Sequence, residues 1–196
     1  MRKSLEYFFD FRSPYSYLAY SQLAGLGAAI VLRPMNVITV MKAVGNSPTT
    51  ILCAAKGRYA RADLGRWARR YGVPLNPADM KAVDGEACLR AVLAAASLED
   101  AAVTTGALFR ACWGQGQTLT SVSEIVSTIA ATGVDTRGLA VRIDDPAVVN
   151  ALAGNCTEAA ERGVFGAPTI MIGDAMFFGN DRLDFVREHL ALEKAA

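Results

Sequence analysis

Two hydroxyl side chains lie where an apolar segment meets the start of a predicted helix. The side chains of residues 5–11 alternate in type with the period of two that is typical of an inner strand. Ser13-Pro14 then supplies a helix N-cap and a first-turn proline. Ser13 and Ser16 are therefore both expected in the first helical turn. Hydroxyls cannot exchange disulfides, so any thiol used at this point must come from another molecule. From the residues alone, helix capping is the favoured interpretation of Ser13.

The other residues that could take part in catalysis or metal binding are scattered along the chain. The only histidine, His189, lies in the last predicted helix, where a structural role is favoured. A Ser-His-Asp or Cys-His arrangement and a histidine-based metal site are therefore disfavoured, and no metal is expected. The cysteines form no Cys-x-x-Cys pair and are interpreted as free thiols in a reducing compartment. They are Cys53, Cys88, Cys112 and Cys156.

Composition indicates a compact protein without a strong overall charge. The chain has 196 residues, 52% of them hydrophobic, and a formal net charge of +1. This near balance favours neither nucleic acid nor an anionic membrane as a partner. Charged residues interrupt the N-terminal apolar segment before a signal-peptide core forms, and no apolar run approaches the roughly 20 residues of a membrane span. The sequence therefore predicts a soluble, cytoplasmic protein.

The order of predicted elements indicates an α/β fold. The N-terminal strand, the helix after Ser13 and a strand at 30–33 form a βαβ unit, and helical patterns follow from about residue 36 to 161. Strands at 169–172 and 176–178 flank a Gly-Asp turn and precede a final helix. This order resembles a thioredoxin-like βαβ…ββα sheet split by a large all-helical insertion. We expect residues 1–35 and 162–196 to form the thioredoxin-like domain, and residues 36–161 to form the helical insertion domain.

Seven segments, in the same order along the chain, resemble the 2-hydroxychromene-2-carboxylate isomerases. That family groups with kappa-class glutathione transferases and is related to disulfide oxidoreductases with helical insertions. Two positions depart from the common family pattern: Thr49, where a second proline is frequent, and Phe178, where tryptophan is frequent. The segments are FDFRSPYSYLA (9–19), LRP (32–34), GNSP (45–48), Lys56 with Tyr59, DLGRWARRYGVP (63–74), GVFGAPT (163–169) and FFGNDRL (177–183).

The resemblance implies a glutathione site around Ser13. Its hydroxyl would donate a hydrogen bond to the glutathione sulfur and favour the thiolate. Pro168 would follow a cis peptide bond, so that the backbone of Ala167 pairs with the cysteinyl part of the tripeptide. The γ-glutamyl end would be held by Asn180 and Asp181.

The remaining contacts implied by the resemblance involve the other end of the tripeptide and the substrate. Asn46 and Lys56 match positions that contact the glutathione backbone and glycyl carboxylate. Basic residues between positions 56 and 70 usually form a solvated face, but some could meet an anionic substrate. Unaided, the sequence gives Asn46 as a loop residue and Lys56 as a solvated one.

As an activity, the resemblance implies glutathione-dependent interconversion of 2-hydroxychromene-2-carboxylate and trans-o-hydroxybenzylidenepyruvate in the breakdown of naphthalene-like aromatics. A homodimer is also expected. The nearest alternative is a kappa-type transferase or peroxidase that consumes glutathione. A disulfide oxidoreductase is disfavoured by Ser13 and Ser16, and a redox-inactive thioredoxin-fold binding module is the non-enzyme alternative.

Overall fold

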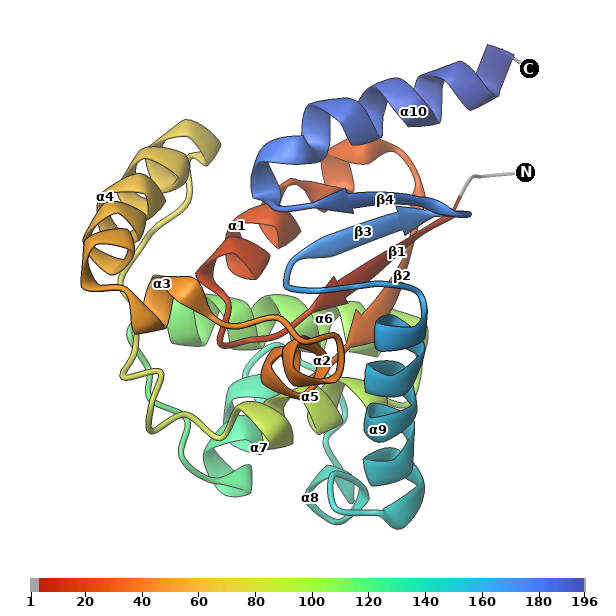
Figure 1. Ribbon diagram of the computed structural model, residues 1–196. Coiled ribbons are helices and arrows are strands. Elements are labelled where there is room, and N and C mark those ends of the chain that lie inside the picture. The colour runs from red at the N-terminus through yellow and green to blue at the C-terminus, as the bar shows by residue number, and fades with distance from the viewer. Residues whose placement is uncertain (1–3, 196) are drawn as a thin grey trace.

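The computed structural model describes residues 4–195 as a four-stranded mixed sheet with helices on both faces (Figure 1). The strand order across the sheet is β2-β1-β3-β4. β1 and β2 are parallel, whereas β3 is antiparallel to β1, and β4 is antiparallel to β3. The thioredoxin-like α/β fold predicted from the element order is therefore confirmed. The strands are β1 (Ser4–Phe9), β2 (Ala29–Pro34), β3 (Thr169–Ile172) and β4 (Ala175–Phe178).

A large helical insertion separates β2 from β3, also as predicted. It comprises α2 (Val37–Ala43), α3 (Thr49–Leu52), α4 (Ala54–Tyr71), α5 (Gly85–Leu93), α6 (Leu98–Phe109), α7 (Val122–Ala130), α8 (Leu139–Arg142) and α9 (Pro146–Glu161), with a π-helical turn at Arg110–Gly114. The predicted caps are present. Ser121 and Glu124 form a capping box at the start of α7, and Asp145 caps α9 ahead of its first-turn proline.

The helices outside the insertion belong to the two ends of the chain. α1 (Pro14–Leu23) leads into a 3₁₀ turn (Ala24–Leu26) that ends at Gly27, whose positive φ of 68° suits glycine. The final helix, α10 (Leu183–Ala195), follows a second 3₁₀ turn, η3 (Asn180–Arg182). The sequence placed its start near residue 180, so the α-helix begins later than predicted.

Alternation along β1 divides the apolar side chains between two faces of the sheet. Tyr7 and Phe9 belong to the large cluster that includes α1 and α10 residues, whereas Phe8 packs with Met171 of β3 and Val40 of α2. Figure 1 accordingly shows α1 and α10 on one side of the sheet and α2 and α9 on the other. Both faces of β1 are therefore covered, as expected for a central strand.

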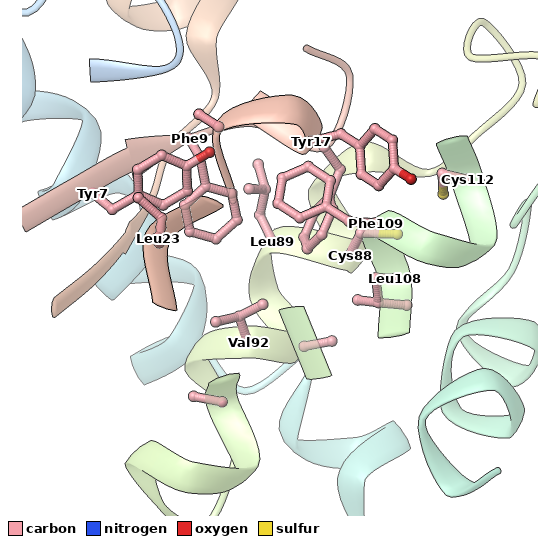
Figure 2. Close-up of a cluster of buried hydrophobic side chains, with 14 of the residues drawn as sticks. Tyr7, Phe9, Tyr17, Leu23, Cys88, Leu89, Val92, Leu108, Phe109 and Cys112 are labelled. Carbon is pink, nitrogen blue, oxygen red and sulfur yellow. The ribbon is translucent and has the colours of Figure 1, made fainter. Parts of the chain in front are cut away.

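One aromatic cluster joins the sheet to the insertion. The ring of Phe109, at the end of α6, lies 5.6 Å from that of Phe9 and 4.6 Å from that of Phe11. Figure 2 shows Phe109 in this cluster, with Tyr17 of α1 and Leu89 of α5. This packing fixes the insertion against the end of β1 from which α1 begins. No helix within residues 4–195 is long and apolar enough to cross a membrane.

Candidate active site

Ser13 caps α1 and also contacts the loop before β3. Its Oγ accepts a hydrogen bond from the Ser16 backbone N–H at 3.2 Å and donates one to the carbonyl oxygen of Ala167 at 3.0 Å. The side chain is only partly buried. The capping role predicted for Ser13 is confirmed, and the second contact brings Ser13 and Ala167 together at the start of α1.

The two serines of the first turn differ in accessibility. Ser16 is fully buried, and its Oγ has no hydrogen-bond partner among residues 4–195. Its carbonyl accepts a 2.5 Å hydrogen bond from the Tyr7 hydroxyl beneath it. Only Ser13 is therefore placed to touch a bound molecule.

The loop before β3 has the backbone form predicted for it. The Ala167–Pro168 peptide bond is cis. The Pro168 carbonyl accepts a hydrogen bond from Gly179 N–H at 2.9 Å, and Thr169 Oγ1 donates to the Gly166 carbonyl at the same distance. The loop is thus held by the residue that follows β4 on one side and by its own turn on the other.

Asn180 and Asp181 lie beside α4 in a pocket of about 240 Å³. Asn180 is 3% exposed, its carbonyl accepts a hydrogen bond from Tyr71, and its side-chain Nδ2 has no partner among the described residues. Asp181 is exposed and pairs with Arg182 at 3.0 Å. Gly179 lets the Asp181 carboxylate lie close to the backbone, because a Cβ at Gly179, whose φ is 99°, would lie 2.5 Å from an Asp181 carboxylate oxygen. An unpaired buried donor beside an exposed carboxylate suits a zwitterionic ligand group.

Tyr15 lies close to Asp63 and Tyr59 of α4 and to Asp181. Burial raises the pKa of Tyr15, and the charge of Asp63, the Tyr59 phenol and the charge of Asp181 raise it further. The Tyr15 side chain thus stays neutral near the start of α1. Sequence reasoning did not single it out, because a tyrosine after a helix-opening proline is ordinary core packing.

Asn46 and Lys56 occupy different parts of the rim. Asn46 Nδ2 donates a 2.7 Å hydrogen bond to the Phe165 carbonyl, which ties the loop after α2 to the loop before β3. Lys56 is exposed in the first turn of α4, beside Cys53. The other basic residues of α4 are exposed as well, and two stack on aromatic rings: Arg66 on Tyr59 and Arg70 on Trp67.

Two exposed phenylalanines flank the Ala167 loop. The rings of Phe165 and Phe178 lie 4.6 Å apart, and the side chains are 39% and 42% exposed. Gly166 gives them room, because a Cβ at this position would lie 2.7 Å from the Phe178 ring. The sequence marked Phe178 as a departure from the family pattern that bears on substrate fit more than on glutathione binding, and the structure shows it as part of an exposed aromatic surface.

An ion pair between a buried carboxylate and a partly exposed guanidinium immediately precedes Ser13. Asp10 is completely buried and accepts hydrogen bonds from the Arg12 backbone N–H, from two guanidinium nitrogens of Arg12 and from Val37 N–H, at 2.7–3.0 Å. Burial opposes the charge of Arg12, but the hydrogen bonds and charge of Asp10 outweigh it and raise the pKa of Arg12. The only sequence signal was an acidic residue interrupting an apolar strand. The predicted strand ran to residue 11, but β1 ends at Phe9 because the chain turns here and Ser13 N–H bonds to the Asp10 carbonyl.

Apart from Cys53 beside Lys56, the thiols and the histidine are not among the candidate site residues. All four cysteines are free; Cys53 is partly exposed, and the other three are buried. His189 packs its ring edge-on against Phe177 at 5.6 Å on α10. The larger cavity, of about 450 Å³ between α2, α5 and α9, contains none of the predicted site residues.

Comparison with known proteins gives consistent results. The DSBA-like thioredoxin domain matches residues 4–191. A 2-hydroxychromene-2-carboxylate isomerase of Sphingobium xenophagum is 35% identical over 97% of this chain and 99% of its own length. Human Glutathione S-transferase kappa 1 is 29% identical over 98% of this chain and 92% of its own length. A solved 2-hydroxychromene-2-carboxylate isomerase superposes with a TM-score of 0.86 at 29% identity, covering 96% of this chain and 94% of that one.

Proposed function

The chain belongs to the 2-hydroxychromene-2-carboxylate isomerase family, within the DSBA-like thioredoxin fold, and from this we propose that it is a glutathione-dependent isomerase. The proposed reaction interconverts 2-hydroxychromene-2-carboxylate and trans-o-hydroxybenzylidenepyruvate. The observation that carries the proposal is the contact between the Ser13 hydroxyl and the Ala167 carbonyl at the N-terminus of α1. The contact joins a hydroxyl donor to the Ala167 backbone, which we propose pairs with the ligand, and neither first-turn serine supplies a thiol.

The residues present fit glutathione. The Ala167 backbone would pair with the cysteinyl residue as an added strand does. The unpaired Asn180 Nδ2 could donate to the γ-glutamyl carboxylate, and Asp181 would meet its ammonium group. Asn46 and Lys56 would hold the glycyl half.

When bound, glutathione supplies a thiolate that adds to the conjugated double bond, permits rotation and is then eliminated. The role of Ser13 is to stabilise that anion. A hydrogen bond to a charged acceptor contributes roughly 1.5–3 kcal/mol, and a helix N-terminus contributes roughly 0.3–1 kcal/mol. At about 1.4 kcal/mol per pKa unit, the two would lower a thiol pKa of ~8.5 by about one to three units.

The aromatic substrate needs a surface close to Ser13. Phe165 lies two residues before Ala167 in the sequence. Phe178 pairs across the sheet with Thr169, the residue after Pro168, and its ring contacts that of Phe165. We assign this ring pair to the aromatic part of the substrate. A basic side chain of α4 would meet its carboxylate.

The test is an ultraviolet assay of the purified protein with 2-hydroxychromene-2-carboxylate, with and without glutathione. Conversion that requires both protein and glutathione supports the proposal. Conversion at the same rate without glutathione, or none with it, would contradict the proposal.

A kappa-type transferase or peroxidase is a second candidate, supported by the similarity to the human transferase. It would use the same site but consume the thiol. The distinction is stoichiometric: isomerisation leaves free thiol constant over many turnovers, whereas conjugation or peroxide reduction removes it in proportion to product.

The setting of the reaction is part of the same proposal. We place it in the cytoplasm, in the breakdown of naphthalene-like aromatics, which accords with the four free cysteines. We also propose a homodimer, to be measured by light scattering coupled to gel filtration.

A further inference from the structure

A buried negative charge lies close to the point where the proposed function requires an anion. Asp10 is 0% exposed at the end of β1, and the Ser13 N–H donates to its backbone carbonyl at 3.0 Å. An uncompensated carboxylate at this position would repel a thiolate beside Ser13, because charges interact strongly where water is largely excluded. The site therefore needs a way to cancel the charge of Asp10.

Arg12 has the geometry to do so. Its Nη2 lies 2.7 Å from Asp10 Oδ2, and its Nε lies 3.0 Å from Oδ1, so the pair is bidentate. The guanidinium is packed against Gly85, where a Cβ would lie 3.0 Å from the Arg12 side chain. The arginine is therefore held in place over the carboxylate.

The charges of Asp10 and Arg12 also act on the thiol of Cys156. Burial is the main factor that raises the pKa of Cys156, and the charges of Asp10 and Glu86 raise it further. The charge of Arg12 acts in the opposite direction. The electrostatic effects of Asp10 and Arg12 therefore reach residues beyond the ion pair itself.

We propose that Arg12 is a positioning residue that neutralises the buried charge of Asp10 and thereby allows the start of α1 to hold an anion beside Ser13. The proposal rests on the proposed function in one respect, namely that an anion is held there. It assigns to the ion pair an electrostatic role in addition to its structural one.

Other charged and titratable groups lie near Arg12, Tyr15 and Cys53. Tyr15 lies on α1 itself, the α4 side contributes Lys56, Tyr59 and Asp63, η3 contributes Asp181, and the α5 side contributes Asp84 and Glu86. All of them remain unchanged in the variants below. Their influence therefore cancels when the variants are compared.

The test needs no glutathione. Ser13→Cys places a thiol at the site, and its pKa is read from the pH dependence of iodoacetamide labelling, with the modified peptide quantified by mass spectrometry. The substitution is combined in turn with Arg12→Gln, Arg12→Lys, Asp10→Asn, and Asp10→Asn together with Arg12→Gln. Arg137→Gln is the matched control, because Arg137 pairs with Asp135 at the same spacing on the surface.

We expect Arg12→Gln to raise the thiol pKa by about one unit, and Asp10→Asn alone to lower it by a similar amount. Arg12→Lys, which keeps the charge, and the neutral double variant should stay within about half a unit of the parent. Arg137→Gln should have no effect. If Arg12→Gln does not fold, Asp10→Asn and the double variant still test whether Arg12 neutralises the charge of Asp10.

An unchanged thiol pKa in folded Arg12→Gln would overturn the proposal, as would an Asp10→Asn variant whose thiol pKa is not lowered. Failure of the proposed function would appear elsewhere, as a wild-type protein without glutathione-dependent isomerisation. The two failures are therefore distinguishable.

Discussion

The Ser13 hydroxyl donates a 3.0 Å hydrogen bond to the Ala167 carbonyl and so joins two residues that are 154 positions apart in the chain. A serine hydroxyl has a single proton to donate. If that proton turns to a bound thiolate, the Ala167 carbonyl becomes free to accept a backbone N–H from the same ligand. One hydrogen bond within the protein would then be replaced by two to the ligand, both at the start of α1.

Removal of the Asp10 carboxylate from its pair with Arg12 should be strongly destabilising, because it leaves the arginine charge uncompensated. We expect Asp10→Ala to lower the free energy of unfolding by about 3–5 kcal/mol, because it leaves the Arg12 guanidinium and Val37 N–H without their acceptor. Urea denaturation measures the change. Asp135→Ala removes a surface pair of the same spacing and should cost about 0–1 kcal/mol. Equal losses in the two variants would show that burial of the pair is unimportant.

Asp181 should contribute to glutathione affinity. We expect Asp181→Asn to weaken binding about 10- to 100-fold, the equivalent of losing a charge-assisted contact of roughly 1.5–3 kcal/mol with the γ-glutamyl ammonium. Calorimetric titration with glutathione gives the dissociation constant. Asp135→Asn, which removes an exposed carboxylate paired with Arg137 outside this pocket, is the control and should bind normally. Similar weakening in both variants would indicate a general loss of negative charge.

Phe178 should affect the aromatic substrate more than glutathione. We expect Phe178→Leu to raise KM for the hydroxychromene carboxylate about 2- to 10-fold, since aromatic pairs contribute about 0.5–1.5 kcal/mol beyond their buried area. The dissociation constant for glutathione should change less than twofold. Phe185→Leu replaces a ring that is 54% exposed on α10 and serves as the control. An unchanged KM for Phe178→Leu would remove this ring from substrate binding.

Cys53 should be the first of the four cysteines to react. The backbone N–H groups of Lys56 and Ala55 lower the pKa of the Cys53 thiol, and the charge of Lys56 acts in the same direction. A lowered pKa means that the thiolate forms at lower pH, so alkylation should reach half its maximal rate below the pH required for free cysteine. Burial raises the pKa of Cys156, which therefore serves as an internal control for peptide mass spectrometry. Labelling of Cys156 as fast as that of Cys53 would contradict this prediction.

The sequence predicted those parts of the fold that depend on local rules. Ser13-Pro14, Ser121 with Glu124, and Asp145-Pro146 each carry a capping signal within four residues, and all three cap helices as predicted. Helix boundaries were less accurate where tertiary contacts decide them. Asn180 begins a 3₁₀ turn, with its carbonyl bonded to Tyr71 more than 100 residues away, and the α-helix starts three residues later.

The site could be predicted only where a motif marks it. Ser13, Ala167 and Pro168 were found by resemblance, and the structure brings them together. Asp10, Arg12 and the contact of Phe165 with Phe178 were missed, although Phe178 itself was linked to substrate fit. Their significance depends on burial and on contacts between distant segments, and a single acidic residue or phenylalanine in a sequence reveals neither.

The central claim, that Ser13 stabilises a borrowed thiolate, is tested most directly by the thiol pKa of bound glutathione. It can be measured by following thiolate ultraviolet absorbance against pH in the wild-type, Ser13→Ala and Ser97→Ala proteins. Ser97 caps α6 in the same way, with its Oγ accepting from Asp100 N–H at 3.0 Å, so its variant controls for loss of a cap. We predict a wild-type pKa about one to three units below the ~8.5 of a free thiol, raised by about one to two units in Ser13→Ala and unchanged in Ser97→Ala. A wild-type pKa equal to that of free glutathione, or one that Ser13→Ala leaves unchanged, would contradict the account.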